Sequence, residues 1–142
     1  MTQASMTRYT GTKTLSARPM THGEYNAYRG WTPPEVEDQT TAGYLVEYED
    51  GGQANDSRHA GYISWSPADV FEKSYRPTGT FQDRVRLEKA ELDTKIDALA
   101  KFLPTEIFGG LPTDEQDRMT AQLAAMQDYS GCLAERIAAF PA

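Results

Sequence analysis

The amino-acid sequence predicts an α+β fold, in which a small antiparallel β-rich N-terminal module with short helices precedes a long antiparallel helical hairpin. Two observations support this prediction. Up to Pro77-Thr78-Gly79 the chain is rich in glycine, proline, tyrosine and tryptophan, and its apolar patterns are short. Beyond that point apolar residues recur at helical spacing along two long stretches. We therefore divide the chain into a β-rich module, residues 1–79, and a hairpin, residues 80–142.

The first elements that we expect are one strand and one short helix. Residues 12–18 alternate in a way that is typical of a strand, which Pro19 would end. Thr21-His22-Gly23-Glu24 has the form of a capping box, so we expect a helix over residues 22–28 that ends at Gly30.

A β-hairpin with a long connection is predicted next. Gly43–Tyr48 is rich in aromatic and β-branched residues, and residues 62–65 have the pattern of the returning strand. Asp50-Gly51-Gly52 supplies residues that tolerate the positive φ of a turn. We then expect a helix over residues 67–75, with Ser66 as its cap. The residues of this helix expected in the core are Val70 and Phe71.

Two long helices form the predicted hairpin. Thr80 is expected to cap the first, which stops before Pro104, and Thr113-Asp114-Glu115-Gln116 is a second capping box for a helix that Pro141 ends. The apolar seam of the first helix consists of Phe81, Val85, Leu92, Ile96, Leu99 and Leu103. The seam of the second consists of Met119, Leu123, Met126, Leu133, Ile137 and Phe140, with Tyr129 and Ser130 in its central gap. Because such a hairpin buries little surface alone, we expect its seam to pack against the β-rich module, a second copy of the chain, or both.

Composition argues against several functional classes. The net charge of −7 argues against binding to a nucleic-acid polymer, because that affinity requires a basic surface. No apolar stretch is long enough to span a bilayer, and the N-terminal residues lack the apolar region of a secretory signal. Cys132 is the only cysteine, and we expect it to be buried and inert in a reducing compartment.

The sequence favours binding over catalysis. The two histidines, His22 and His59, lie far apart and belong to no metalloprotease, hydrolase or redox motif. The Glu-x-x-His pairs of a di-iron bundle are missing, and Gly51-Gly52 is better explained as a turn than as a phosphate cradle. We therefore expect no enzyme, no metal site and no cofactor.

Aromatic residues gather around arginines in two stretches of the N-terminal module. Residues 24–31 contain Arg29, and residues 58–62 contain Arg58. Flat aromatic rings stack on nucleobases, and guanidinium groups match phosphate oxygens. The alternative is that Trp31 and the other large aromatic side chains form the core of the module. Arginine is a less natural core residue, so the arginines are the better ligand candidates.

The hairpin sequence resembles a known family. Over residues 80–140 it is similar to the helical hairpin shared by phage anti-CBASS and Thoeris anti-defence sponge proteins. The similarity rests on FQDRVRLEKAELDTKIDALAKFL, a short Gly/Pro linker and EQDRMTAQLAAMQDYSGCLAERIAAF. Two stretches before the hairpin are RPMTHGEYNAYRGW and GYISWSPADVFEKSYRP. They resemble the N-terminal module found before such hairpins in phage and prophage proteins. The arrangement is most like the Thoeris anti-defence members, which carry a β-rich part before the hairpin.

The resemblance implies a function and a set of ligand residues. Members of this family sequester cyclic nucleotide immune messengers without cleaving them. Thoeris-type members bind cyclic ADP-ribose isomers, and oligomeric hairpins bind cyclic di- or trinucleotides. The resemblance also implies a homo-oligomer, either a dimer or a hexamer, in the cytoplasm of an infected or lysogenic bacterium. The candidate ligand residues are Arg29 and Arg58 for phosphate or ribose, Trp31 and Phe81 for base stacking, Arg118 and Arg136 from a neighbouring helix, and Arg84, Lys89 and Tyr129 for a second, hairpin-built pocket.

A second function is compatible with the same sequence. The chain could be a phage interaction or assembly protein whose hairpin seam binds a partner helix. The aromatic residues would then serve only as core. Capture of a small nucleotide by the purified protein distinguishes the two functions.

Overall fold

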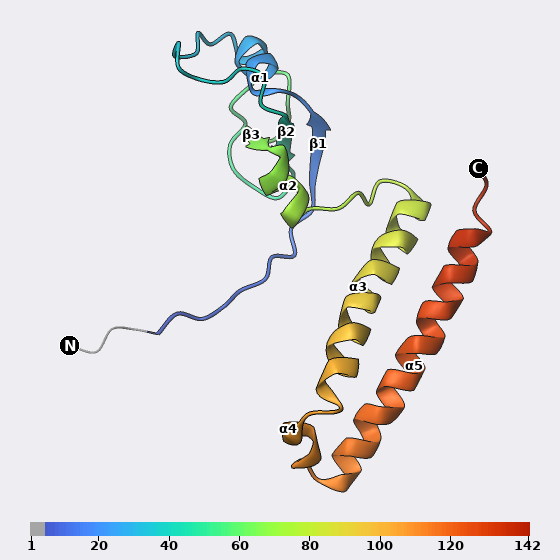
Figure 1. The fold of residues 1–142 in the computed structure, drawn as a ribbon. Helices are drawn as coiled ribbons and strands as arrows, with labels where there is room; N and C mark the ends of the chain where they lie inside the picture. Colours follow the sequence, from blue (N-terminus) through green and yellow to red (C-terminus); the bar gives the residue numbers. More distant parts are fainter. Residues whose placement is uncertain (1–4) are drawn as a thin grey trace. The chain divides into compact units, whose positions relative to one another are not determined.

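The computed structural model describes residues 5–142, which form three strands and five helices (Figure 1). In chain order they are β1 (Leu15–Pro19), α1 (His22–Arg29), β2 (Gly43–Tyr48), β3 (Ile63–Pro67), α2 (Ala68–Ser74), α3 (Phe81–Phe102), α4 (Glu106–Gly109) and α5 (Thr113–Ala138). The chain divides into two compact units, one ending at Tyr75 and the other beginning at Arg76. The first unit holds the strands with α1 and α2, and the second holds the remaining helices. The predicted α+β class, a small antiparallel sheet followed by long helices, is confirmed.

The sheet of the first unit is antiparallel, with β2 between β1 and β3. Gly43 and Pro67 pair at one end of the β2–β3 ladder. β1 starts later than predicted and includes Pro19, which an edge strand tolerates because one side of its backbone faces away from the ladder. After β2 the chain turns at Gly51 and Gly52, whose φ angles of 155° and 83° suit glycine.

Helix α1 starts and stops where its capping residues predict. The hydroxyl of Thr21 accepts a hydrogen bond from the backbone N–H of Glu24 at 3.1 Å, which satisfies a donor of the first turn. Gly30 ends the helix in the left-handed conformation, with φ of 73°. These two caps fix the length of α1 and therefore the place of its buried residues against the sheet.

The core of the first unit forms where α1 packs on β2 and β3. Tyr25, Leu45 and Ile63 are its buried members, and Trp65 and Met20 pack beside them. The indole N–H of Trp65 donates to the carbonyl oxygen of Met20 at 2.7 Å, so its polar atom is satisfied. Trp65 is therefore a structural residue of this small core.

The predicted cap of α2 is wrong. Ser66 lies in β3 opposite Tyr44, and Pro67 occupies the cap position without a side-chain hydrogen bond. Pairing with β2 holds Ser66 in the ladder, so its hydroxyl bonds the carbonyl of Pro67 at 3.4 Å instead. Val70, expected in the core, is 54% exposed, because α2 turns Phe71 toward the sheet. The ring of Phe71 stacks on Tyr44 with 4.3 Å between centroids.

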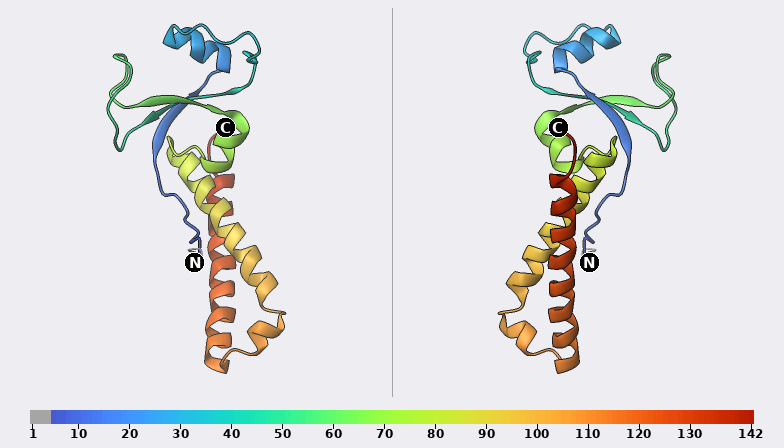
Figure 2. Two further views of the ribbon diagram at one scale, coloured as in Figure 1. Left: turned by 90° about the vertical axis from the view of Figure 1, so that its left-hand side faces the viewer. Right: turned by 90° about the vertical axis from the view of Figure 1, so that its right-hand side faces the viewer.

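In the second unit α3 and α5 run antiparallel and lie side by side (Figures 1 and 2). They contain 22 and 26 residues. The predicted capping box of α3 is present, since the Thr80 side chain accepts from Asp83 and the Asp83 side chain accepts from the backbone of Thr80. α3 ends at Phe102, before Pro104, as its sequence predicts. Among the described helices, none has the length and apolar composition that crossing a membrane requires.

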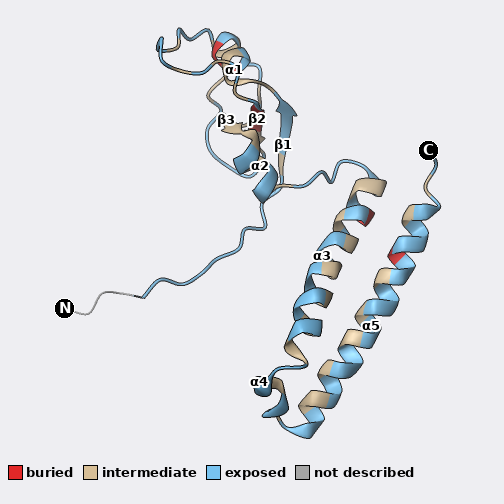
Figure 3. Cartoon of the chain, viewed as in Figure 1, coloured by how far each residue is buried: buried red, intermediate tan, exposed pale blue. Residues whose placement is uncertain are grey.

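The predicted seam faces inward but is only partly covered. Val85 and Leu133 are its buried members, Phe81 is 50% exposed, and the other seam residues are half-buried. Figure 3 shows the result as narrow half-buried stripes on two otherwise exposed helices. Cys132, expected to be buried, is exposed. It precedes Leu133, and neighbouring positions on a helix point in different directions, so only one of them reaches the seam.

The linker of the hairpin differs from its prediction. Residues 106–109 form the short helix α4, in which Thr105 caps the N–H of Phe108 at 3.3 Å. The Phe108 ring meets Phe102 edge to face with 5.9 Å between centroids, which holds the turn against the end of α3. Thr113 does not cap α5, because Pro112 takes that position and Thr113 is already helical.

Candidate functional site

The predicted ligand residues fall into two groups, one in each unit. The first unit contains Arg29, Trp31 and Arg58. The hairpin unit contains Phe81, Arg84, Lys89, Arg118, Tyr129 and Arg136.

Arg29 is held in place by groups of the first unit. Its guanidinium donates to the hydroxyl of Tyr25 at 2.9 Å and to the carbonyl of Asn55 at 3.3 Å. It also lies 4.5 Å from the centroid of the Trp31 ring and 3.8 Å from a carboxylate oxygen of Asp56. Trp31 is 52% exposed, so one of the predicted stacking rings is available to a ligand. The structure thus brings Arg29 and Trp31 together.

Arg58 is occupied by a carboxylate. Its Nε and Nη2 donate to the two oxygens of Asp56 at 2.9 and 2.7 Å, and Nη2 also donates to the carbonyl of Tyr28 at 2.7 Å. The hydrogen bonds from Arg58 hold the pKa of Asp56 well below its ordinary value. The guanidinium lies 3.5 Å from the centroid of the Tyr28 ring. A ligand phosphate at Arg58 would therefore have to compete with Asp56.

A tyrosine, a histidine and a glutamate form a chain of hydrogen bonds next to Arg58. Nε2 of His59 lies 2.6 Å from the Tyr28 hydroxyl, and Nδ1 lies 2.5 Å from Oε1 of Glu47. The bond to His59 lowers the pKa of Glu47, which also accepts from the backbone N–H of Gly61 at 3.1 Å. This order of groups occurs in nucleophilic catalysis. None of the three side chains lines the cleft beside Lys13 or the cleft beside Arg29, and their bonds tie α1, β2 and the β2–β3 connection together.

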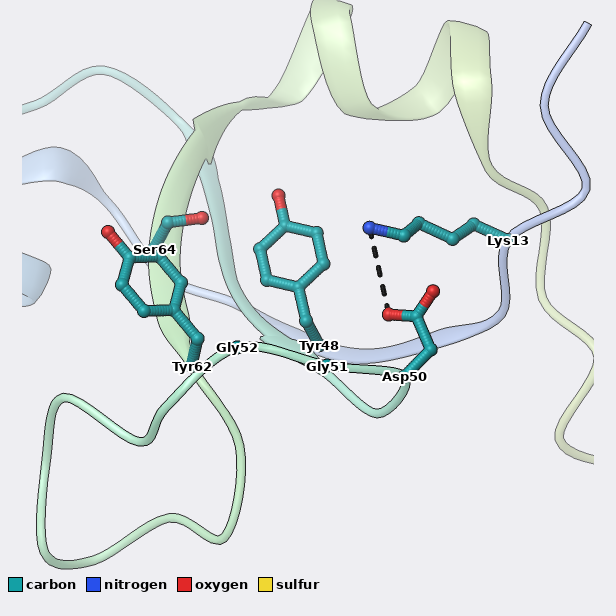
Figure 4. A pocket seen from close by; sticks show the side chains of 7 residues that line it. All are labelled: Lys13, Tyr48, Asp50, Gly51, Gly52, Tyr62 and Ser64. Carbon is teal, nitrogen blue, oxygen red and sulfur yellow. Dashed lines mark ion pairs between the residues drawn. The ribbon is translucent and has the colours of Figure 1, made fainter.

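The larger cleft of the first unit has a volume of about 540 Å³. It lies between Lys13, Tyr48, Tyr62 and the Asp50–Gly52 turn, with Ser64 at its back (Figure 4). Figure 4 shows Tyr48 between Tyr62 and Lys13, with the ammonium group of Lys13 directed toward the Tyr48 ring. The sequence reading did not select this group, because its residues come from separate parts of the chain.

A second cleft of about 440 Å³ contains Arg29 and Trp31. Its wall includes the rings of His22 and Trp65, which stack with 4.2 Å between centroids. Tyr62 lines this cleft as well as the larger one. No group of three or more histidine, cysteine or carboxylate side chains converges as a metal site within residues 5–142.

In the hairpin unit, Asp93, which pairs with Lys89 on the same helix, and Tyr129 make contacts between α3 and α5. Lys89 pairs with Asp93 at 2.6 Å, and Asp93 accepts from the hydroxyl of Ser130 at 2.6 Å. The Tyr129 hydroxyl donates to Glu88. These contacts lower the pKa of Asp93, chiefly through Lys89, and raise the pKa of Tyr129, chiefly through the bond to Glu88. Both predicted ligand residues therefore have structural contacts in the middle of the hairpin.

Two further predicted arginines have contacts of their own. Arg118, in the first turns of α5, donates to Glu115 at 2.8 Å and lies 3.6 Å from Asp114. Because the helices are antiparallel, Arg118 lies at the opposite end of the hairpin from the start of α3. Arg84, in the first turns of α3, donates to the carbonyl of Thr78 at 3.1 Å.

The remaining predicted residues meet at the end of the hairpin where α3 starts and α5 stops. The rings of Phe81 and Phe140 contact edge to face with 5.9 Å between centroids. The guanidinium of Arg136 lies 5.3 Å from the Phe81 ring, and that of Arg86 lies 5.4 Å from the Phe140 ring. Arg86 and Arg136 form no ion pair with any residue that the structure describes. We call these four residues the arginine–phenylalanine cluster.

Sequence reasoning selected half of this cluster. Phe81 and Arg136 were predicted ligand residues, whereas Phe140 was assigned to the seam and Arg86 was not selected. The missing signal is the register of α3 against α5, which places Phe140, just beyond the end of α5, against Phe81 at the start of α3. Chemically, the cluster offers aromatic faces for stacking and forked donors for phosphate oxygens.

Comparison with known proteins finds relatives of the hairpin segment. The Sequestin family profile matches residues 79–139. An uncharacterized 7.5 kDa protein from the denB–rIIB intergenic region of Enterobacteria phage T4 is 40% identical over 60 residues, which are 42% of this chain and 94% of the phage protein. The chain belongs to the Sequestin family. This sequestin is therefore a phage anti-defence protein of the sequestering type, and the resemblance of its hairpin to such proteins is confirmed. No solved structure matches it significantly.

Proposed function

We propose that this sequestin binds a cyclic nucleotide immune messenger, either a cyclic ADP-ribose isomer or a cyclic di- or trinucleotide, and does not cleave it. We place the main ligand contacts at the arginine–phenylalanine cluster. One observation carries the proposal: Arg86 and Arg136 face phenyl rings, have no ion-pair partner among the described residues, and lie within the segment that matches the Sequestin family.

The chemistry of the cluster suits a cyclic nucleotide, which presents nucleobases and phosphates in one small molecule. Phe81 is 50% exposed, so its ring offers a face for a base. Such stacking contributes about 1–3 kcal/mol per base. Arg86 and Arg136 offer forked donors for phosphate oxygens. Two uncompensated arginines can attract an anion locally although the whole chain carries a net charge of −7.

Self-assembly of the hairpin would enclose the ligand. Most of the seam between α3 and α5 is only half-buried, so a second hairpin can cover it and remove more apolar surface from water. A pocket between copies would also exclude water from the guanidinium–phosphate contacts, which strengthens them. A homo-oligomer, a dimer or a hexamer, is therefore part of the proposal.

Binding without cleavage agrees with the side chains of the cluster. Phenylalanine has no reactive group, and arginine stays protonated, so neither acts as a nucleophile or a general base at neutral pH. Arg29, Trp31 and Arg58 form a second proposed contact set in the first unit. At that place a ligand would have to exchange with the contacts that Asp56 makes to both arginines.

A second candidate function rests on the same half-buried seam. An amphipathic helix of another protein could cover it in place of a second copy, as in helix-in-groove recognition. The chain would then be a phage interaction or assembly protein, and the arginine–phenylalanine cluster would only close the end of the hairpin.

Calorimetric titration of the full chain with a panel of cyclic dinucleotides, cyclic trinucleotides and cyclic ADP-ribose isomers tests the site. Arg86→Ala and Arg136→Ala should each weaken binding of the captured ligand by about 2 kcal/mol, because each removes a charged hydrogen-bond donor from phosphate. That is roughly a 30-fold change in Kd. Phe81→Ala should weaken it by about 1–3 kcal/mol through lost stacking.

Lys101→Ala is the matched control, because this lysine is paired with a carboxylate at the other end of the hairpin and belongs to neither proposed contact set. It should leave the affinity unchanged. Wild-type affinity in all three cluster variants would remove the cluster from the site. Failure of every class of messenger to bind the wild-type protein would remove the sponge function itself and favour the partner-helix alternative.

A further inference from the structure

The larger cleft of the first unit contains unused hydrogen-bonding groups beside aromatic rings. The hydroxyls of Tyr48, Tyr62 and Ser64 form no hydrogen bond with another residue in the described part of the chain. The rings of Tyr48 and Tyr62 lie 6.3 Å apart between centroids and are inclined by 41°. A planar ligand can therefore stack on one of these rings and meet the other at an angle, beside the hydroxyl groups that line the cleft (Figure 4).

A cation and a carboxylate stand side by side at the edge of this cleft. The ammonium nitrogen of Lys13 lies 3.6 Å from an Asp50 carboxylate oxygen and 4.7 Å from the centroid of the Tyr48 ring. Both side chains are about half exposed, at 47% and 52%. An exposed pair of this kind is held weakly, so a ligand can use both members. Lysine binds phosphate as a point charge, and a carboxylate accepts hydrogen bonds from the hydroxyls of a ribose.

The geometry points to a nucleotide-binding site in this cleft, whose lining residues all belong to the first unit. We propose that Tyr62 stacks on the base of a mononucleotide while Tyr48 contacts it at an angle, that Asp50 accepts from its ribose diol, and that Lys13 contacts its phosphate. Ser64 is placed to bond the base or the sugar. The volume of about 540 Å³ lies in the range of small-molecule sites. This ligand differs from the cyclic messenger that is proposed for the hairpin. The proposal of this site does not depend on the proposed function of the hairpin.

Adenosine 5′-monophosphate is a suitable probe, titrated into the full chain by calorimetry. Lys13→Ala should weaken its binding about fivefold, the upper range for one exposed charge. Tyr62→Ala should weaken it about tenfold through lost stacking. The matched controls are Lys73→Ala, on the surface of α2, and Tyr9→Ala, at a residue that is 91% exposed. Both controls should bind the probe as the wild-type protein does.

Two chemical variants of the probe separate the contacts. Adenosine lacks the phosphate, so it should bind the wild-type protein more weakly than the monophosphate does. In Lys13→Ala, adenosine and the monophosphate should bind with equal affinity. The 2′,3′-dideoxy monophosphate lacks the diol, so it should bind the wild-type protein more weakly than adenosine 5′-monophosphate does. In Asp50→Ala the two should bind with equal affinity. The decisive quantity is the ratio of the Kd values of these two monophosphates in each protein. The absolute affinity is less informative, because removal of Asp50 also frees the charge of Lys13.

Several outcomes would overturn the proposal. One is the absence of binding at millimolar concentrations of the monophosphate, and another is equal affinity in Lys13→Ala, Tyr62→Ala and both controls. A third is loss of monophosphate binding in Arg136→Ala but not in Lys13→Ala, which would place the probe on the hairpin. Messenger capture should persist in Lys13→Ala, so the failure of this site and the failure of the proposed function are distinguishable.

Discussion

At the scale of single residues, the first unit depends on one close approach between strands that only glycine permits. A Cβ atom at Gly43 would lie 2.4 Å from the Ser66 carbonyl oxygen and 2.4 Å from the ring of Trp65. Those neighbours cannot move easily, because Ser66 belongs to the β2–β3 ladder and the Trp65 indole is bonded to the backbone of Met20. Gly43 thus lets Trp65 reach its place beside the core.

Gly43→Ala should therefore destabilise the first unit by about 2–3 kcal/mol, the usual cost of overfilling a packed site. Gly79→Ala is the matched control, since nothing lies within 4 Å of its Cβ position. Urea unfolding followed by tryptophan fluorescence measures the effect, because both tryptophans, Trp31 and Trp65, lie in this unit. Equal stability of the two variants would contradict the close-packing account.

Single residues also show where sequence reasoning stops. Arg29 and Arg58 were selected because an arginine among aromatic residues is unusual in a core. The structure supplies the protein contacts that the sequence could not: Asp56 lies beside both guanidinium groups, and Asn55 accepts a hydrogen bond from Arg29. The proximity of Arg29 to this loop depends on how the β2–β3 connection folds back over α1, which no local pattern specifies.

At the scale of elements, the two capping sequences of the hairpin behave differently. Thr80 has the extended backbone of a cap and bonds the N–H of Asp83 at 3.0 Å. Thr113 has the same sequence signature, yet Pro112 takes the cap position with φ of −56° and ψ of 144°. The Thr-x-x-acid or amide pattern identifies a helix start correctly in both places, but it does not determine which residue is the last non-helical one.

Thr80→Ala should destabilise the hairpin by about 1 kcal/mol through the loss of its cap. Thr113→Ala should change the stability by less than about 0.5 kcal/mol, the usual range for a surface position without special contacts. Thermal unfolding followed by circular dichroism at the helix band measures both variants, compared at equal protein concentration because assembly affects the midpoint. A larger effect at Thr113 than at Thr80 would contradict the assignment of the caps.

The elements themselves were largely predictable. The long periodic stretches gave both hairpin helices and the inward direction of their seams, and β-branched and aromatic residues gave β2. The short helix α4 was missed, because it is fixed by the contact of Phe108 with Phe102 rather than by periodicity. The sequence also did not show which residue of the opposite helix each seam residue contacts, because that depends on the register of α3 against α5. That is why Phe140 and Arg86 were not assigned to the site.

At the scale of the whole molecule, the hairpin leaves apolar surface that a second protein surface could cover. Its seam is mostly half-buried, and one end presents two arginines without ion-pair partners in the described chain. Membership of the Sequestin family gives this arrangement its functional context, sequestration in phage anti-defence. We infer that assembly and ligand capture use the same helices, with the seam joining copies and the arginine–phenylalanine cluster holding the ligand.

The most direct test of this account is the recovery of an intact messenger. The purified protein is mixed with the panel of cyclic dinucleotides, cyclic trinucleotides and cyclic ADP-ribose isomers, washed by filtration and heat-denatured. The released molecules are then identified by mass spectrometry. We predict that one class is retained through washing and is released with unchanged mass only on denaturation. Release of a converted product would contradict binding without cleavage, and retention of none of these molecules would contradict the sponge function.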